Sequence, residues 1–282
     1  MKNQWKTMMA LMLCAGVANA AYVTIGGAGN SDDTTGYGGV SYEYKISSTE
    51  VSIAEFQAYR TATSTTGNEG YWNEEVRTVG TAAPATMVTL YEAMKYCNYL
   101  TSGDVNDGVY NFSGETYQST DRASAMATHG TIYALPTEDE WYKAAYYNVS
   151  GNSYSLYADG SGTVPTEGGG STGWNYNGVN SSPNYTRDVA DGSSEENSTV
   201  NMNGNVFEWM EDSAGVIRGG SYDVYELYLR SSSRYAYAPS SEADSVGFRL
   251  VGVVPEPATA GMLAISGLLI AGYRRFKKHY SL

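Results

Sequence analysis

The chain has 282 residues and a formal net charge of −13, with 30 acidic against 17 basic residues. A surface this acidic repels nucleic acids and anionic lipids, so DNA and RNA are excluded as partners. Two Cys and two His are too few for a zinc centre with such ligands, and they argue equally against a Ser-His-Asp triad or a Cys-His pair.

Residues 1–20 have the pattern of a secretory signal peptide. Lys2 and Lys6 precede an apolar stretch from Met8 to Val17, and a small-x-small site ends at Ala20. The pattern predicts export of the chain that follows. Six of the 17 basic residues lie in the two terminal segments, so the body up to Glu256 keeps 11 basic and 30 acidic residues. At about 235 residues, this body can form one large domain or two small ones.

Three helices are predicted in the body. Ser52 with Glu55, and Thr137 with Glu140, have the spacing of capping boxes. In the middle helix, apolar residues recur at helical spacing and include Cys97, which is therefore predicted to be a small buried residue rather than a nucleophile. The predicted helices cover residues 52–62, 90–100 and 137–147.

Short strands and a long loop fill the rest of the body. Residues 150–199 are almost all Gly, Ser, Asn, Thr and Tyr, which is typical of a functional or loosely ordered loop. Few helices, short strands and much irregular structure predict the α+β class. The predicted strands are Tyr22–Ile25, Val40–Ile46, Thr131–Leu135, Val216–Ser221 and Gly247–Val251.

The chain ends with Pro255-Glu256-Pro257, an apolar stretch from residue 258 to 273, and a basic cluster at 274–278. Sixteen residues at about 1.5 Å each span roughly 24 Å, slightly less than a hydrocarbon core of ~30 Å. The basic residues behind them favour a cytoplasmic C-terminus. The segment 254–282 resembles the PEP-CTERM sorting signal of Gram-negative bacteria. The resemblance implies processing by an exosortase, transient insertion into the inner membrane as a C-terminal hydrophobic helix, and a final location at the cell surface or in the extracellular matrix. An ordinary tail anchor is the alternative.

Several phrases in the body occur in a characteristic order. They are Tyr42–Ile46, Leu135–Trp141, Asn201–Trp209, Arg218–Tyr222, Leu229–Ser231 with Arg234, and Gly247–Arg249. In this order and spacing they resemble the sulfatase-modifying-factor family, that is, domains like the formylglycine-generating enzyme. The resemblance covers residues 21–253. It implies a C-type-lectin-like α+β fold with much irregular structure.

The resemblance also implies a structural Ca²⁺ ion. Its ligands would be Glu208, Asn201 and the backbone carbonyl groups of Gly204 and Val206. Hard oxygen ligands suit calcium, and the acidic body is consistent with it. The alternative is that Glu208 is a carboxylate at the end of a strand, bonded to nearby backbone N–H groups.

The formylglycine-generating enzymes use two cysteines just after the Gly-Gly-Ser turn to hold copper and oxidise a substrate cysteine. Residues 222–229 follow that turn here and contain no sulfur. Because the soft thiolate ligands of Cu(I) are missing, we expect no copper and predict that formylglycine formation is lost.

Tyrosines and arginines gather in the same part of the chain. Tyr is a common contact residue for sugars, peptides and protein partners, and the alternative is that these tyrosines are packing residues in a chain with 26 Tyr. The tyrosines predicted to line a ligand groove are Tyr222, Tyr225, Tyr228 and Tyr235, with Tyr237 close by. The arginines predicted to form structural pairs with Asp or Glu, or alternatively a patch for an anionic ligand, are Arg218, Arg230, Arg234 and Arg249.

Three functions are therefore compatible with the sequence. The first is an exported, non-catalytic domain that binds a glycan or peptide at the cell surface or in the matrix. The second is an enzyme of unknown reaction that uses a groove carboxylate such as Asp223 or Glu226. The third is a structural component of the envelope or biofilm without a specific ligand.

Overall fold

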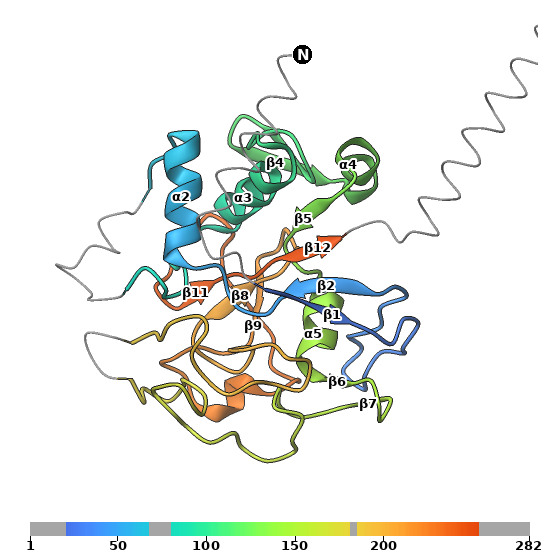
Figure 1. Ribbon diagram of the computed structural model, residues 1–282, viewed down its shortest axis with the longest axis vertical. Coiled ribbons are helices and arrows are strands. Elements are labelled where there is room, and N and C mark those ends of the chain that lie inside the picture. Colours follow the sequence, from blue (N-terminus) through green and yellow to red (C-terminus); the bar gives the residue numbers. More distant parts are fainter. Residues whose placement is uncertain (1–20, 68–79, 181–184, 254–282) are drawn as a thin grey trace, which may run out of the picture.

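The computed structural model describes residues 21–67, 80–180 and 185–253 (Figure 1). The predicted signal peptide and sorting signal lie outside these residues. The strands are β1 (Tyr22–Ile25), β2 (Tyr44–Ser47), β3 (Tyr110–Ser113), β4 (Thr116–Thr120), β5 (Ile132–Ala134), β6 (Tyr147–Asn148), β7 (Ser153–Tyr154), β8 (Phe207–Trp209), β9 (Val216–Arg218), β10 (Tyr235–Ala236), β11 (Val246–Gly247) and β12 (Val251–Val253). The helices are α2 (Ile53–Thr63), α3 (Leu90–Ser102), α4 (Arg122–His129), α5 (Glu138–Tyr146) and a 3-10 turn, η3 (Glu226–Leu229).

Two four-stranded sheets organise the molecule. The first has the order β1-β2-β12-β5 with antiparallel neighbours throughout, and Val251 of β12 lies opposite both Ile46 and Ala134. The second has the order β10-β9-β8-β11, in which β11 runs parallel to β8. Figure 1 shows α2, α3 and α4 on one side of these sheets and the long loops on the other. The fold is therefore α+β, as the sequence predicts.

The core is aromatic where the helices meet the sheets. Phe56 of α2 lies 5.5 Å from the Tyr96 ring of α3 and 5.9 Å from Phe248, and all three side chains are buried. Edge-on and tilted ring pairs at such distances add to the hydrophobic gain of burial. Cys97 is buried in the same core and burial raises the pKa of its thiol, which confirms the prediction that it is a packing residue.

Capping residues set where the helices begin. Ser52 and Thr137 accept hydrogen bonds from the backbone N–H of Glu55 and Glu140, and each Glu side chain bonds back to its cap, so both predicted capping boxes are confirmed. Thr89 forms a third box at the start of α3. Each cap satisfies backbone donors that a helix start leaves open, which is worth about 1 kcal/mol.

The structure differs from the sequence prediction at several places. Strands β6, β7, β8 and β10 and the turn η3 were not predicted. Helix α4 and the β3–β4 hairpin lie in a stretch for which no element was predicted. The strand predicted over 40–46 begins only at Tyr44, within β2. The strand predicted over 247–251 is instead the end of β11 and the start of β12, which belong to different sheets. Phe248 and Leu250 have the alternating apolar pattern of a strand because they are buried while the chain crosses between the sheets.

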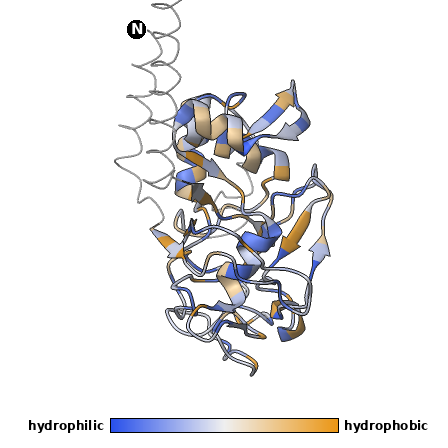
Figure 2. Ribbon diagram, turned by 90° about the vertical axis from the view of Figure 1, so that its right-hand side faces the viewer, coloured by the Kyte–Doolittle hydropathy of each residue, from blue (hydrophilic) through white to orange (hydrophobic). Residues whose placement is uncertain are grey.

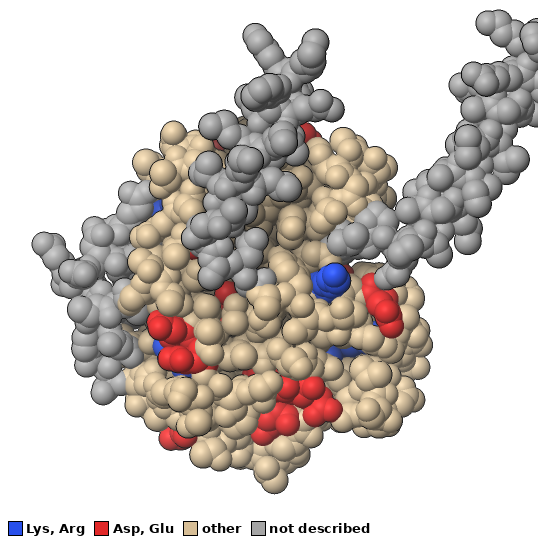
Figure 3. Space-filling view, viewed as in Figure 1, with Lys and Arg blue, Asp and Glu red and all other residues tan. Residues whose placement is uncertain are grey.

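The polarity of the molecule follows this layout. Apolar residues collect in strands and helices, and the long loops carry mostly polar or neutral residues (Figure 2). Acidic side chains form separate patches on the face seen in Figure 3, where basic side chains are few. Within the described ranges, no helix is long and apolar enough to cross a membrane.

Candidate functional site

Glu208 of β8 lies at the centre of a buried ion pair. Arg249 donates from Nε to Glu208 Oε2 at 2.6 Å and from its Nη2 to Oε1 at 2.7 Å. Trp141 of α5 donates from Nε1 to Oε2 at 2.6 Å. All three side chains are fully buried. An Arg–carboxylate pair is strongest when the guanidinium bonds to both carboxylate oxygens. Here the pair and Trp141 together join β8, α5 and the crossing between the two sheets.

These contacts do not fit the predicted calcium site. A cation bound to Glu208 would have to share the two carboxylate oxygens with the guanidinium of Arg249. The two positive charges would then lie close together and repel each other. Asn201 is also engaged, because its Oδ1 accepts from Arg187 at 2.9 and 2.6 Å. The contacts agree better with the alternative of a bonded carboxylate, although its partners are side chains instead of backbone N–H groups.

Chelation tests this geometry directly. We expect the melting temperature of the purified body to change by less than about 2 °C when EDTA replaces calcium, because an ion that does not bind the native state cannot stabilise it. Glu208→Gln is expected to melt lower to the same extent with and without calcium. A drop of several degrees on chelation of the unaltered protein would instead restore Glu208 as a calcium ligand.

A second buried group, which the sequence did not single out, lies beside this pair. Glu50 accepts from the side-chain amides of Asn205 at 2.8 Å and Asn201 at 3.2 Å, and it is fully buried. Burial raises the pKa of Glu50 to about 7, while the charge of Arg249 opposes the shift. Asn201 and Asn205 both have left-handed backbones, with φ of 64° and 61°. Asn tolerates the left-handed conformation better than most residues. The Asn-rich run from 201 to 205 was therefore the sequence signal for an unusual backbone next to Glu50.

The prediction that the arginines form structural pairs is confirmed for three of the four. Besides Arg249, Arg218 is buried and lies 2.6 Å from Glu138, which also pairs with Arg234 at 2.9 Å. Arg218 additionally donates to two backbone carbonyl groups and covers the rings of two tyrosines. Arg230 differs, since its Nε donates to the hydroxyl of Tyr157 at 3.1 Å.

The Gly-Gly turn bends the chain within the core directly after β9. Gly219 and Gly220 have φ of +100° and +80°. A Cβ on Gly220 would lie 2.5 Å from Leu229, and one on Gly219 would lie 3.2 Å from the Trp141 ring. Both positions therefore require glycine, as expected for a bend with close approach.

The tyrosines predicted to contact a ligand lie in different environments after this turn. Tyr222 is buried, and its ring stacks on Tyr185 with centroids 5.5 Å apart, so it does not line an exposed surface. Tyr228 and Tyr235 stack on each other at 4.9 Å, and both contact Phe207. The structure thus joins η3 to β10 through these rings.

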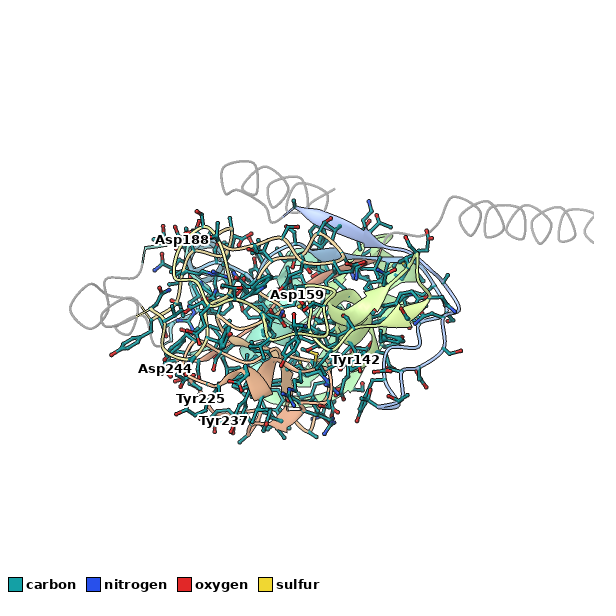
Figure 4. The ribbon with its side chains drawn as sticks, turned by 90° about the horizontal axis from the view of Figure 1, so that it is seen from below. Tyr142, Asp159, Asp188, Tyr225, Tyr237 and Asp244 are labelled. Carbon is teal, nitrogen blue, oxygen red and sulfur yellow. The ribbon has the colours of Figure 1, made fainter. Side chains whose placement is uncertain are left out.

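Side chains in and around this stack are exposed. Tyr225 is 65 % and Leu227 51 % exposed, whereas Tyr235 and Tyr237 are 39 % and 37 % exposed. Tyr225 and Tyr237 are labelled at the same edge of the molecule in Figure 4. We call the surface formed by Tyr225, Leu227, Tyr228, Tyr235 and Tyr237 the tyrosine face. Asp223, the predicted groove carboxylate next to it, is exposed and accepts from Ser221 Oγ at 2.6 Å.

A cavity of about 330 Å³ lies elsewhere, between α2 and α3. It shares no residue with the tyrosine face. Two ion pairs, Arg60 with Glu92 and Lys95 with Glu115, contribute to its wall.

A comparison with known protein families shows to which family the chain belongs. The sulfatase-modifying factor enzyme 1-like domain matches residues 35–253, which include both sheets except β1 and the whole tyrosine face. The chain belongs to this family.

Solved structures with the fold of the sulfatase-modifying factor family agree with this assignment. Variable protein 1 of Treponema denticola is 20 % identical with a TM-score of 0.57, over 83 % of this chain and 95 % of its own. CarF is 20 % identical with a TM-score of 0.58, over 85 % and 100 %. PvdO from Pseudomonas aeruginosa is 19 % identical with a TM-score of 0.52, over 83 % and 92 %. At these identities the likeness concerns the fold alone. No curated protein sequence matches the chain.

The cysteine pair that the resemblance implies for formylglycine formation has no counterpart after the Gly-Gly turn of this chain. The segment after Gly220 carries Ser, Tyr, Asp, Val, Glu and Leu but no Cys, and Cys97 lies buried on α3. A buried thiol with a raised pKa on another element cannot supply a pair of thiolates there.

Proposed function

We propose that the chain is an exported, non-catalytic member of the sulfatase-modifying factor family that binds a glycan or peptide at the cell surface or in the extracellular matrix. The tyrosine face is the proposed contact surface. Tyr225, Leu227 and Tyr228 follow the Gly-Gly turn within eight residues. This is the observation that carries the proposal, because the resemblance puts the family's reacting groups there.

The exposure of this face supports a contact role over a packing role. Tyr225 is the most exposed large hydrophobic residue among those described, and Leu227 next to it is half exposed. Exposed aromatic and apolar side chains that adjoin one another are typical of binding surfaces, whereas scattered ones are not. The stacked rings of Tyr228 and Tyr235 give the surface a rigid base, so little conformational entropy is lost on binding.

The absence of a cysteine pair supports the non-catalytic part of the proposal. Residues 222–229 contain no cysteine and therefore offer no thiolate ligands for a copper ion. The copper-dependent oxidation of a substrate cysteine would require such ligands at this position. Export rests on the signal-peptide pattern of residues 1–20 and on the resemblance of residues 254–282 to a sorting signal.

Binding to a glycan and peptide array tests the proposal. The double variant Tyr225→Ala/Leu227→Ala is expected to lose at least about tenfold in affinity for the ligand that the unaltered body selects, since exposed aromatic anchors dominate such contacts. Both side chains project from the fold, so the melting temperature is expected to stay within about 2 °C.

The matched control is Val149→Ala/Val164→Ala, which removes two apolar side chains of 46 % and 51 % exposure from other loops. This control is expected to bind like the unaltered protein. Equal binding by the tyrosine-face variant would place the contact elsewhere. A lack of any selective binding would favour the structural role in the envelope.

A further inference from the structure

Arg187 occupies a buried cage of neutral oxygen atoms. Its side chain is 4 % exposed. Nη1 donates to the backbone carbonyl oxygens of three glycines: Gly173 at 2.9 Å, Gly168 at 3.1 Å and Gly170 at 3.3 Å. On the other side, Nε and Nη2 donate to Asn201 Oδ1 at 2.9 and 2.6 Å. Converging carbonyl and amide oxygens are the surroundings that proteins otherwise offer to a hard cation.

The glycines let three carbonyl groups converge on one point. Two backbone hydrogen bonds close this segment, from the N–H of Gly168 to the carbonyl oxygen of Trp174 and from the N–H of Trp174 to the carbonyl oxygen of Thr166, both at 3.0 Å. A Cβ on Gly168 would lie 2.1 Å from the carbonyl oxygen of Thr172, and one on Gly173 would lie 2.9 Å from Gly168. Side chains at these positions would force the carbonyl groups apart.

The remaining acceptor, Asn201 Oδ1, is oriented by the buried carboxyl group of Glu50. Asn201 donates from Nδ2 to Glu50 and to the carbonyl oxygen of Val189, each at 3.2 Å, so its Oδ1 must point at Arg187. Among the residues that the structure describes, Arg187 has no carboxylate partner within ion-pair distance. A guanidinium with five donors in a planar fork suits such a cage better than an ammonium ion does.

The caged segment leads directly to the residues that support the tyrosine face. Asn177 N–H donates to the carbonyl oxygen of Val224 at 2.8 Å, and Gly178 N–H donates to that of Tyr222 at 2.7 Å. The backbone N–H of Arg187 donates to Asn205 Oδ1 at 3.0 Å. The loop is therefore held at one end by Arg187 and at the other by the segment that carries Tyr225.

We propose that Arg187 is a positioning residue whose guanidinium serves as a built-in cation, ordering residues 166–178 and through them the backbone beneath the tyrosine face. The ordering of the loop does not depend on the proposed ligand binding. Only its consequence for ligand affinity rests on the proposed function.

Hydrogen exchange in Arg187→Lys tests the ordering. A lysine keeps the charge but cannot reach three carbonyl groups and Asn201 at once, because its donors radiate from one atom. The amide hydrogens of Asn177 and Gly178 are expected to exchange about tenfold or more faster, whereas the amides of α5 keep their rates. The control Arg230→Lys, which removes one hydrogen bond to a tyrosine hydroxyl, is expected to leave Asn177 and Gly178 unchanged.

Chemical rescue separates the cation role from ordinary packing. In Arg187→Ala, guanidinium chloride at millimolar concentration is expected to slow exchange at Asn177 and Gly178 and to raise the melting temperature, because the ion binds the vacated cage only in the native state. The unaltered protein and Arg230→Ala are expected to show no such gain.

Parent-like exchange in Arg187→Lys would overturn the proposal, and so would a lack of rescue in a folded Arg187→Ala protein. If the alanine variant does not fold, the lysine variant decides alone. None of these measurements uses a ligand, so they stand whether or not the tyrosine face binds one.

Discussion

Replacing Arg249 with methionine is expected to lower the free energy of unfolding by about 3–5 kcal/mol. After this change the Glu208 carboxylate is still fully buried, and among the described residues only Trp141 donates a hydrogen bond to it. The guanidinium also donates to the backbone carbonyl groups of Ser47, Ser48 and Val200, so the crossing between the two sheets loses these contacts as well. Urea unfolding followed by circular dichroism measures the loss.

The double variant Glu208→Gln/Arg249→Met separates the unpaired charge from the lost packing. Removing both charges is expected to recover part of the stability, because a neutral amide costs less to bury than an unpaired carboxylate and can still accept from Trp141. The double variant should therefore be more stable than Arg249→Met alone. A loss below about 1 kcal/mol in the single variant would show that the pair contributes little.

Stability is expected to fall as the pH rises from about 5 to about 7.5. Glu50 has a pKa of about 7 in the fold against the ordinary 4.5 of a glutamate, so in this window the folded state keeps a proton that the unfolded state has released. The unfolded state then binds fewer protons, and the free energy of unfolding decreases with pH by about 3 kcal/mol in total. The raised pKa values of Glu195 and Glu211, both caused mainly by burial, act in the same direction.

Glu50→Gln provides the control for this pH dependence. The amide does not titrate and its oxygen can still accept from Asn205, so the slope between pH 5 and 7.5 is expected to flatten toward the contribution of the other carboxyl groups. The measurement is the urea midpoint at several pH values. An unchanged slope in this variant would show that Glu50 is ionised in the fold throughout the window.

Local signals predicted the parts of the fold that depend on neighbours in sequence. The capping boxes at Ser52 and Thr137 place the starts of α2 and α5, because both partners lie within one helical turn. The turn at Gly219 was likewise readable from two residues without Cβ. Helix α4 was missed because its short Ala- and Ser-rich sequence has one buried residue, Ala125, and hence no apolar periodicity.

The candidate site depends on contacts that local signals cannot report. Glu208 meets Arg249 across 41 residues, and Asn205 meets Glu50 across 155. A pattern of oxygen ligands around Glu208 reads the same whether a metal ion or a guanidinium faces it. The burial of Tyr222 beside the exposed Tyr225 is similarly decided by Tyr185, which packs from a distant loop.

The position of β12 also determines how the domain would carry a mechanical load. β12 ends at Val253 and is hydrogen-bonded on both sides, to β2 and to β5. A force applied at residue 253 therefore acts on an interior strand of the first sheet. It is shared by the hydrogen bonds to β2 and to β5, whereas a force on an edge strand acts on one set of hydrogen bonds only. Because rupture under force is governed by the unfolding rate, a body tethered at this end would resist drag longer than one held through the edge strand β1.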